Sequence, residues 1–317
     1  MSATTPSSSK YENLLDEEVW AFIRKTNSFF PADATALSID EQRALYNEMC
    51  NAFKKQPEQA VQRSDYLISK RDVPVREYRT VSGNNNLPVV VYYHGGGFVV
   101  GNLDSHDDVC ATICAFTQFN VISCEYKLSP EFKHPEAFDD AYAVFQGVAM
   151  NTTQPVLVIG DSAGATLAAS VSGKARHCEK QVAAQILIYP YLGGPTESGS
   201  CVEHAEAPML STSDVKYYDQ MRIDLNKPHP DDETFAPLWT TDFSKLPPTA
   251  IFSAQCDPLC DDGVIYAQNI RLAGGQAHCT IEPGLVHGYL RARHSTARAK
   301  ESFERILLAI QSLSNSQ

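Results

Sequence analysis

The chain lacks an excess of basic residues. Its 317 residues include 26 lysines and arginines against 38 aspartates and glutamates, and the net charge is −12. The basic residues are scattered along the chain rather than clustered. Nucleic-acid binding and adsorption to an anionic membrane both need a basic face. Neither kind of partner is therefore expected.

Long apolar runs are also missing. The longest apolar segments, such as LPVVVYY at residues 87–93, have the length of a strand, whereas a membrane-spanning helix needs about 20 residues. The N-terminal stretch MSATTPSSSK is polar and has no basic segment followed by an apolar one, so no signal peptide is expected. These absences predict a soluble, cytoplasmic protein.

Cysteine shows no pattern of a disulfide framework or a zinc site. The nine cysteines are dispersed, and no C-x-x-C pair is present. Cys110 and Cys114 stand four apart, as do Cys256 and Cys260, but neither pair has a second pair nearby to complete a metal site. We predict reduced thiols that pack as small apolar residues, and no metal.

What the sequence does contain is an alternation of strand and helix patterns. From about residue 64, short apolar runs alternate with helix-length segments, which predicts a mostly parallel sheet flanked by helices, an α/β fold. The predicted strands are a meander at 65–80 and runs at 87–93, 120–126, 155–160, 184–190, 249–254 and 277–283. The predicted helices between them are 104–117, 135–150, 162–177, 261–275 and 297–313.

Two amphipathic segments precede the sheet. Residues 13–30 and 38–55 carry apolar side chains three to four positions apart, and Ser38 with Glu41 has the spacing of a capping box. We predict an N-terminal helical cap segment at 1–63 and a main α/β domain at 64–317. The long interval 191–239, with a helical pattern at 211–221, is expected to contribute to the cap.

A serine stands at a tight corner in GDSAG, residues 160–164, where an apolar strand gives way to an Ala-rich helix. The outer glycines let the backbone approach closely, while Ser162 takes a strained turn at the N-terminus of the helix. Free N–H groups there favour developing negative charge, which suits a nucleophile. A serine at this place is also an ordinary helix N-cap, so the motif needs support.

Support comes from HGGGF at residues 94–98, directly after a buried strand. Three glycines in a row free backbone N–H groups to face an anionic oxygen. A phosphate-binding loop is the competing interpretation, but no Lys-Ser/Thr follows and the glycine spacing is not G-x-G-x-x-G. His94 is expected to brace this loop.

A base and an acid follow in the order expected for a serine nucleophile. Asp257 comes just after the strand at 249–254, and His287 lies in a Gly-flanked loop after the strand at 277–283. All three side chains can meet at the carboxyl edge of the sheet. Asp261 and Asp262 are rivals for the acid, but they open a helix and are expected to serve as its N-terminal carboxylates.

With these motifs in this order, the chain resembles the hormone-sensitive lipase-like family of carboxylesterases, also called bacterial lipase family IV. The matching stretches are HGGGF, EYKLSPE, GDSAG, DPLCDDG and GLVHGY, at 94–98, 125–131, 160–164, 257–263 and 284–289. The second stretch departs from the family's usual DYRLAPE at Glu125, Lys127 and Ser129. The resemblance implies an α/β-hydrolase catalytic domain, carboxylic ester hydrolysis, and no metal or organic cofactor.

Roles for individual residues follow from the resemblance, position by position. It implies that Ser162 is the nucleophile, His287 the general base and Asp257 the orienting acid. It places the oxyanion hole at the backbone N–H groups of Gly96, Gly97 and Ala163. Asp161 would then have a structural role at the GDSAG turn and would not be a second catalytic acid.

The resemblance and the apolar cap also suggest a substrate class. We expect a small-molecule ester with an acyl chain of about two to eight carbons, because a capped apolar pocket disfavours large lipid droplets. The apolar residues in question are Trp20, Phe22, Phe29, Phe30, Met209, Leu210, Tyr217, Tyr218 and Met221. Family members often dimerise, which makes a homodimer an expectation. An amidase or deacetylase with the same triad, or a non-catalytic receptor on the same fold, remains an alternative.

Overall fold

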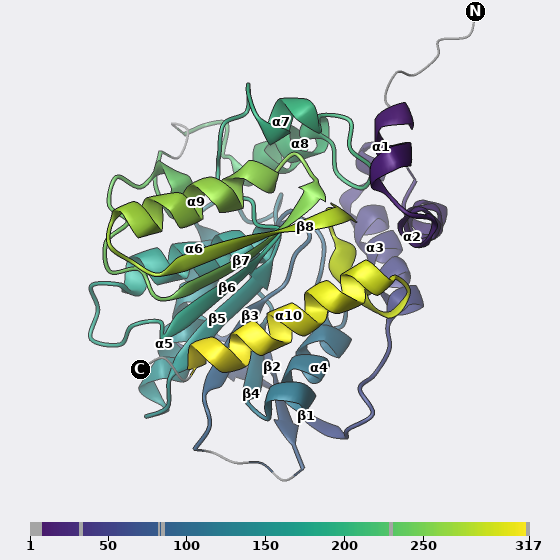
Figure 1. The fold of residues 1–317 in the computed structure, drawn as a ribbon. Coiled ribbons are helices and arrows are strands. Elements are labelled where there is room, and N and C mark those ends of the chain that lie inside the picture. The colour runs from purple at the N-terminus through teal and green to yellow at the C-terminus, as the bar shows by residue number, and fades with distance from the viewer. Residues whose placement is uncertain (1–7, 32–33, 82, 84–85, 228–230, 315–317) are drawn as a thin grey trace, which may run out of the picture.

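The computed structural model describes residues 8–31, 34–81, 83, 86–227 and 231–314. Within these residues the centre of the molecule is an eight-stranded sheet with the order β1-β2-β4-β3-β5-β6-β7-β8 (Figure 1). From β4 to β8 neighbouring strands run parallel, and β1 and β2 join as an antiparallel hairpin at one edge. The strands are β1 Val61–Ile68, β2 Val73–Thr80, β3 Val89–Tyr93, β4 Asn120–Cys124, β5 Val156–Asp161, β6 Ala184–Ile188, β7 Thr249–Cys256 and β8 Ala277–Val286.

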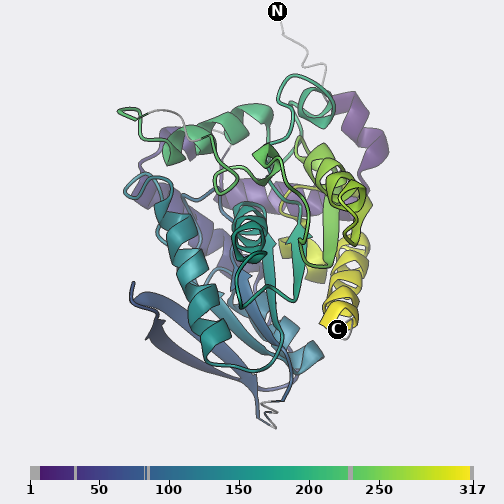
Figure 2. The ribbon, with the colours of Figure 1, turned by 90° about the vertical axis from the view of Figure 1, so that its left-hand side faces the viewer.

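Helices cover both faces of the sheet. On one face α4 (Asp107–Thr117) and α10 (Ala297–Ser314) pack against the strands and each other. On the other face lie α5 (Glu136–Met150), α6 (Ala163–Ala175) and α9 (Cys260–Leu272) (Figures 1 and 2). This arrangement is the α/β-hydrolase fold that the alternating pattern and the motifs predict.

Strand β3 shows how the sequence builds two cores. All five of its residues are buried, and side chains alternate between the faces of a strand. Val90 and Tyr92 belong to the core beneath α4 and α10, whereas Val89, Val91 and Tyr93 belong to the core beneath α5 and α6. An uninterrupted apolar run is therefore what a strand covered on both faces requires.

The remaining helices gather at one end of the sheet. They come from the N-terminal region and from the long interval before β7, and Figures 1 and 2 place them beyond the ends at which the parallel strands finish. These elements are α1 Ser8–Leu14, α2 Glu17–Phe29, α3 Ile39–Phe53, α7 Ser200–Glu203 and α8 Thr212–Arg222, with short 3-10 turns at Ala34–Ala36 and Pro237–Trp239. Together these helices cover that end of the sheet, and they are called the cap from here on. A further 3-10 turn, Tyr289–His294, follows β8.

Local predictions hold at several places. The Ser38–Glu41 capping box is present at the start of α3, and α8 lies where the helical pattern at 211–221 predicts it. Strand β1 begins at Val61, slightly before the position at which the pattern changes. Within the described residues all nine cysteines are free thiols, and they are buried or half-buried except for the exposed Cys178.

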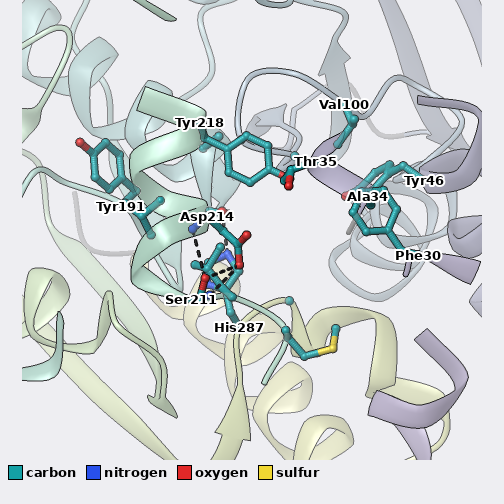
Figure 3. Close-up of a pocket in the computed structure, with 18 of the residues that line it drawn as sticks. Phe30, Ala34, Thr35, Tyr46, Val100, Tyr191, Ser211, Asp214, Tyr218 and His287 are labelled. Carbon is teal, nitrogen blue, oxygen red and sulfur yellow. Dashed lines mark hydrogen bonds between the residues drawn. The ribbon is translucent and has the colours of Figure 1, made fainter. Parts of the chain in front are cut away.

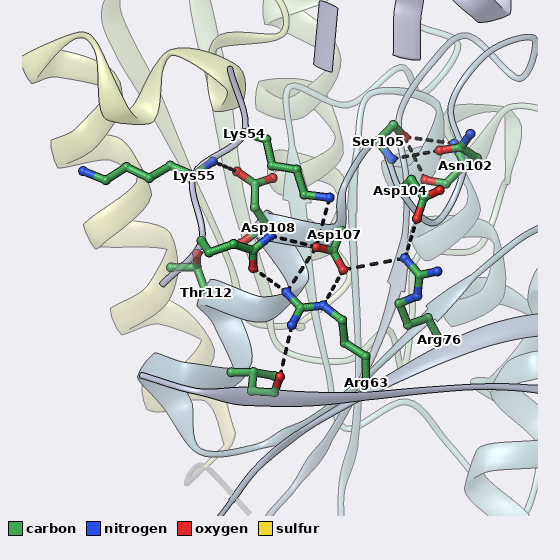
Figure 4. A network of polar contacts seen from close by, with 12 residues as sticks. Lys54, Lys55, Arg63, Arg76, Asn102, Asp104, Ser105, Asp107, Asp108 and Thr112 are labelled. Atoms are coloured by element: carbon green, nitrogen blue, oxygen red, sulfur yellow. Dashed lines mark hydrogen bonds and ion pairs between the residues drawn. The ribbon is translucent and has the colours of Figure 1, made fainter. Parts of the chain in front are cut away.

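A polar network ties the end of α3 to the sheet (Figure 4). Asp107, at the start of α4, accepts hydrogen bonds from Arg63 at 2.7 Å and Gln56 at 2.9 Å and pairs with Lys54 at 3.1 Å. Burial opposes ionisation of this carboxyl, but these partners outweigh it and hold the pKa of Asp107 well below its usual range. The neighbouring Asp108 pairs with Arg293.

We expect Asp107→Asn to lower the free energy of unfolding by about 2–3 kcal/mol, because it removes the buried negative charge that Arg63 and Lys54 pair with. Since the folded-state pKa is lowered, this stabilisation is present above about pH 4 and is lost as the pH falls below that value. Urea unfolding at neutral and acid pH measures it. The control is Asp104→Asn, whose side chain is 70% exposed and pairs with Arg76; equal losses for both variants would contradict the prediction.

Candidate active site

Four predicted site segments lie at the carboxyl ends of parallel strands. The glycine loop follows β3, Ser162 follows β5, Asp257 follows β7 and His287 follows β8. Parallel strands present these ends at one edge of a sheet, where open α/β sheets place their sites. The structure brings all four segments together beneath the cap.

The backbone at Ser162 is strained. Its φ is +52° and ψ is −120°, in a region that non-glycine residues rarely adopt and that costs about 1–3 kcal/mol. A Cβ atom on Gly164 would lie 2.0 Å from the carbonyl oxygen of Tyr93, so only glycine lets α6 approach β3 this closely. The Ser162 N–H also donates to the carbonyl of Ile188 at 2.9 Å. The turn is thus fixed from both neighbouring strands.

Ser162, His287 and Asp257 form a continuous hydrogen-bonded chain. Ser162 Oγ lies 2.8 Å from His287 Nε2, and His287 Nδ1 lies 2.7 Å from Asp257 Oδ2. Asp257 is only 1% exposed, and its other oxygen accepts from the Leu259 N–H at 2.9 Å. With Nδ1 protonated toward the carboxylate, Nε2 is free to accept a proton from the serine.

The glycine loop places backbone N–H groups beside the serine. Gly96 and Gly97 have φ values of +127° and +60°, and both line the same cavity as Ser162 and Ala163. No group in the described part of the chain accepts a hydrogen bond from the N–H of Gly96, Gly97 or Ala163. A Cβ on Gly97 would meet the Tyr218 ring at 2.4 Å, so the loop packs directly under α8.

Asp161 joins the glycine loop to the serine turn. It is 3% exposed, and its carboxylate accepts from the Gly95 N–H at 2.9 Å, from Tyr92 at 2.8 Å and from Tyr189 at 3.2 Å. Burial raises the pKa of this carboxyl, but nearby His106 and these hydrogen bonds prevail and hold it well below its usual range. The Tyr189 ring, whose hydroxyl donates to Asp161, also contacts His287, with ring centroids 4.9 Å apart.

His94 lies inside the glycine loop, where the sequence predicts a brace. Its Nδ1 is 2.8 Å from the carbonyl oxygen of Gly95, and its ring stacks on Tyr126 with centroids 4.3 Å apart. Burial is the main cause that lowers the pKa of His94 to about 3. The imidazole is therefore neutral. Its contacts with Gly95 and Tyr126 support the glycine loop.

Asp261 and Asp262 do more than start a helix. Both lie in the first turn of α9, as expected, but their carboxylates bind another segment. Asp262 accepts from the Leu192 N–H at 2.7 Å, and Asp261 accepts from the Ser200 N–H at 2.8 Å. Burial raises the pKa of Asp262 to about 7. No sequence pattern indicates these contacts, because their partners are backbone groups distant in the chain.

A cavity of about 510 Å³ opens above the serine (Figure 3). Residues from the N-terminal segment and from α8 wall it, including Phe30, Tyr46 and Tyr218. Of the apolar residues singled out in the sequence, Phe30, Met209, Leu210 and Tyr218 line the cavity. Phe22 is buried in the core instead, and Trp20, Phe29 and Met221 pack against that core. The Tyr217 hydroxyl accepts a hydrogen bond from Gln42 at 3.0 Å.

Within the described residues, no group of three or more His, Cys, Asp or Glu side chains is arranged to hold a metal ion. No helix in the same ranges is long and apolar enough to span a bilayer.

Comparison with known proteins gives the family. A family model described as the alpha/beta hydrolase fold matches residues 90–291. Carboxylesterase NlhH of Mycobacterium tuberculosis is 33% identical over 293 residues, which cover 89% of this chain and 92% of that protein. Ethyl acetate hydrolase of Pseudomonas putida is 30% identical over 290 residues, with 87% and 91% covered.

Solved esterase structures have the same fold as this chain. A hyperthermophilic esterase from the archaeon Pyrobaculum calidifontis superimposes with a TM-score of 0.85 at 28% identity, covering 95% of this chain and 99% of that one. The chain therefore belongs to the hormone-sensitive lipase-like carboxylesterases of the α/β-hydrolase fold.

Proposed function

We propose that this carboxylic ester hydrolase cleaves short- to medium-chain esters through an acyl-enzyme on Ser162. The observation that carries the proposal is the hydrogen-bonded chain from Ser162 through His287 to Asp257 at the base of the cavity. A serine hydroxyl is a weak nucleophile until a base accepts its proton. Here the base and its orienting carboxylate are both within hydrogen-bond distance.

In the proposed reaction Ser162 Oγ attacks the ester carbonyl while His287 Nε2 accepts its proton. Asp257 keeps the imidazole in the required tautomer and stabilises the imidazolium. The negative charge on the carbonyl oxygen is met by the N–H groups of Gly96, Gly97 and Ala163, which are otherwise unpaired in the described residues. His287 then protonates the departing alcohol, and water releases the acid by the reverse sequence.

The size of the cavity supports a small substrate. About 510 Å³ is within the range of small-molecule sites, and the walls come from cap segments that cover the serine. Such a covered site excludes a lipid interface and fits an acyl chain of about two to eight carbons. We retain as proposals a cap segment at 1–63, a catalytic domain at 64–317 and a homodimer.

We expect Ser162→Ala to lower kcat by about 10⁴-fold or more, because no other group in the proposed site can form the acyl-enzyme. Hydrolysis of p-nitrophenyl butyrate and labelling by a fluorophosphonate both measure it. The matched control is Ser172→Ala in the same helix, whose hydroxyl donates to the carbonyl of Ala168 at 2.9 Å. Turnover by Ser162→Ala at the level of this control would refute the assignment, and so would labelling at another residue.

The pH dependence should show an acid limb. We expect kcat/KM for an uncharged ester to fall as the pH drops, because protonated His287 cannot accept the serine proton. A pH–rate profile measures this, with circular dichroism at each pH to exclude acid unfolding. A profile that stays flat through mildly acid pH in folded protein would contradict the role of His287.

Acyl-chain preference tests the role of the cavity wall. With p-nitrophenyl esters from acetate to palmitate, we expect kcat/KM to peak at or below eight carbons, and Leu210→Ala to move the peak toward longer chains because it shortens a wall residue. The control is Leu225→Ala, whose side chain is 88% exposed. A wild-type peak at long chains, or the same shift in both variants, would contradict the proposal. A matched ester and anilide pair separates this esterase from an amidase.

A further inference from the structure

One charged residue of the cavity wall has no role in the proposed reaction. Arg291 lies in the 3-10 turn that follows His287, and its side chain lines the cavity that contains Ser162. The guanidinium packs over Gly288: a Cβ on that glycine would lie 2.6 Å from Arg291 Nη2. The cation is thus held next to the loop that carries His287.

Arg291 differs from the other ionised residues of the cavity wall. Asp219 accepts from the Tyr191 hydroxyl at 2.6 Å and lies 3.5 Å from Arg222, and Asp214 accepts from the Ser211 N–H at 2.8 Å. By contrast, among the described residues no side chain forms an ion pair or a hydrogen bond with the Arg291 guanidinium, and its Nε is buried without a partner.

Nearby acidic groups are already engaged. Asp108, which lines a small pocket next to Arg291, pairs with Arg293. The described contact of the guanidinium is with the Tyr46 ring, at 5.7 Å from the centroid. A contact with the face of an aromatic ring attracts the cation but uses none of its hydrogen-bond donors in a bidentate contact, as a carboxylate would. The N–H donors of the two terminal guanidinium nitrogens remain available to a ligand.

Thr26, on α2, also lines the cavity. Its hydroxyl is buried and has no hydrogen-bond partner among the described residues. Buried polar groups in folded proteins are normally satisfied, so exceptions in a cavity point to a ligand. A purely apolar acyl chain would leave the charge of Arg291 unpaired, whereas an anionic substrate group would pair with it.

We propose that Arg291 binds a carboxylate carried by the substrate, so that the enzyme prefers anionic esters, such as monoesters of short dicarboxylic acids, over neutral esters of equal size. The planar guanidinium matches a carboxylate with two parallel hydrogen bonds. This inference rests on the proposed function, because it takes Ser162 as the point of attack. It adds the charge of the substrate, which the resemblance did not imply.

Paired substrates test the proposal in the full-length enzyme. Monoethyl glutarate is compared with ethyl pentanoate for a carboxylate on the acyl side, and 4-acetoxybutanoate with pentyl acetate for one on the alcohol side, with acid release followed by pH-stat. We expect one anionic ester to exceed its neutral partner in kcat/KM. Arg291→Met should lower that anionic-to-neutral ratio by about 10- to 100-fold, and Arg291→Lys should restore part of it.

The control variant is Arg24→Met, which removes a guanidinium whose side chain is 60% exposed and pairs with Glu17 on the surface. It should leave the ratio at the wild-type value. If the wild-type enzyme hydrolyses neutral esters but prefers neither anionic ester, the proposal is overturned while the esterase mechanism stands. A parallel loss on anionic and neutral esters in folded Arg291→Met would also overturn it, since Arg291 would then act only in packing.

Binding without turnover separates this inference from the mechanism. In Ser162→Ala, we expect glutarate to raise the melting temperature in a saturable manner, and the neutral diol 1,5-pentanediol to have no such effect. Adding Arg291→Met should abolish the glutarate effect, whereas adding Arg24→Met should preserve it. Glutarate stabilisation that survives Arg291→Met, or that is absent from Ser162→Ala, would contradict carboxylate binding whatever the outcome for Ser162.

Discussion

The carboxylate of Asp161 is the interaction on which the rest of the site depends. It is buried at the end of β5, directly before Ser162, and accepts hydrogen bonds from the Gly95 N–H and from two tyrosine hydroxyls. A buried carboxylate with several donors keeps its charge and fixes their positions. The glycine loop and the serine turn follow different strands. The Asp161 carboxylate holds them in position relative to each other.

The strained turn persists because the surroundings determine it from several directions. Gly164 allows α6 to approach the carbonyl of Tyr93, and the Ser162 N–H is held by β6. Above the turn, the cap is positioned by polar contacts as well as apolar packing. Arg43 on α3 donates to the carbonyl of Val99 at 2.9 Å, just after the glycine loop, and pairs with Glu131. The cap is thus connected to the strand ends beneath it at the residues that follow the glycine loop.

The sequence was informative where a local pattern determines the structure. Strand runs, the Ser38–Glu41 capping box and each short motif depend on neighbouring residues, and the structure has the strands and helices where those patterns place them. The contacts that sequence reasoning missed join residues far apart in the chain. Nothing around Arg291, in YLRARH, separates it from a surface arginine, and its contact with the Tyr46 ring of α3 at the cavity is visible only in the structure.

Two buried carboxylates follow β7, and they contact different parts of the site. One contacts the histidine, and the other contacts the segment that leads to the cap helices α7 and α8. Asp257 and Asp262 are both buried, so their surroundings, not their exposure, distinguish them. Asp257 faces His287, and its negative charge stabilises the protonated form of the imidazole. Asp262 faces the N–H groups of Leu192 and Gly194, at the start of the segment that supplies α7 and α8. Because Asp262 stands in the first turn of α9, five residues after Asp257, one short stretch of chain contacts both the histidine and the segment that leads to α7 and α8.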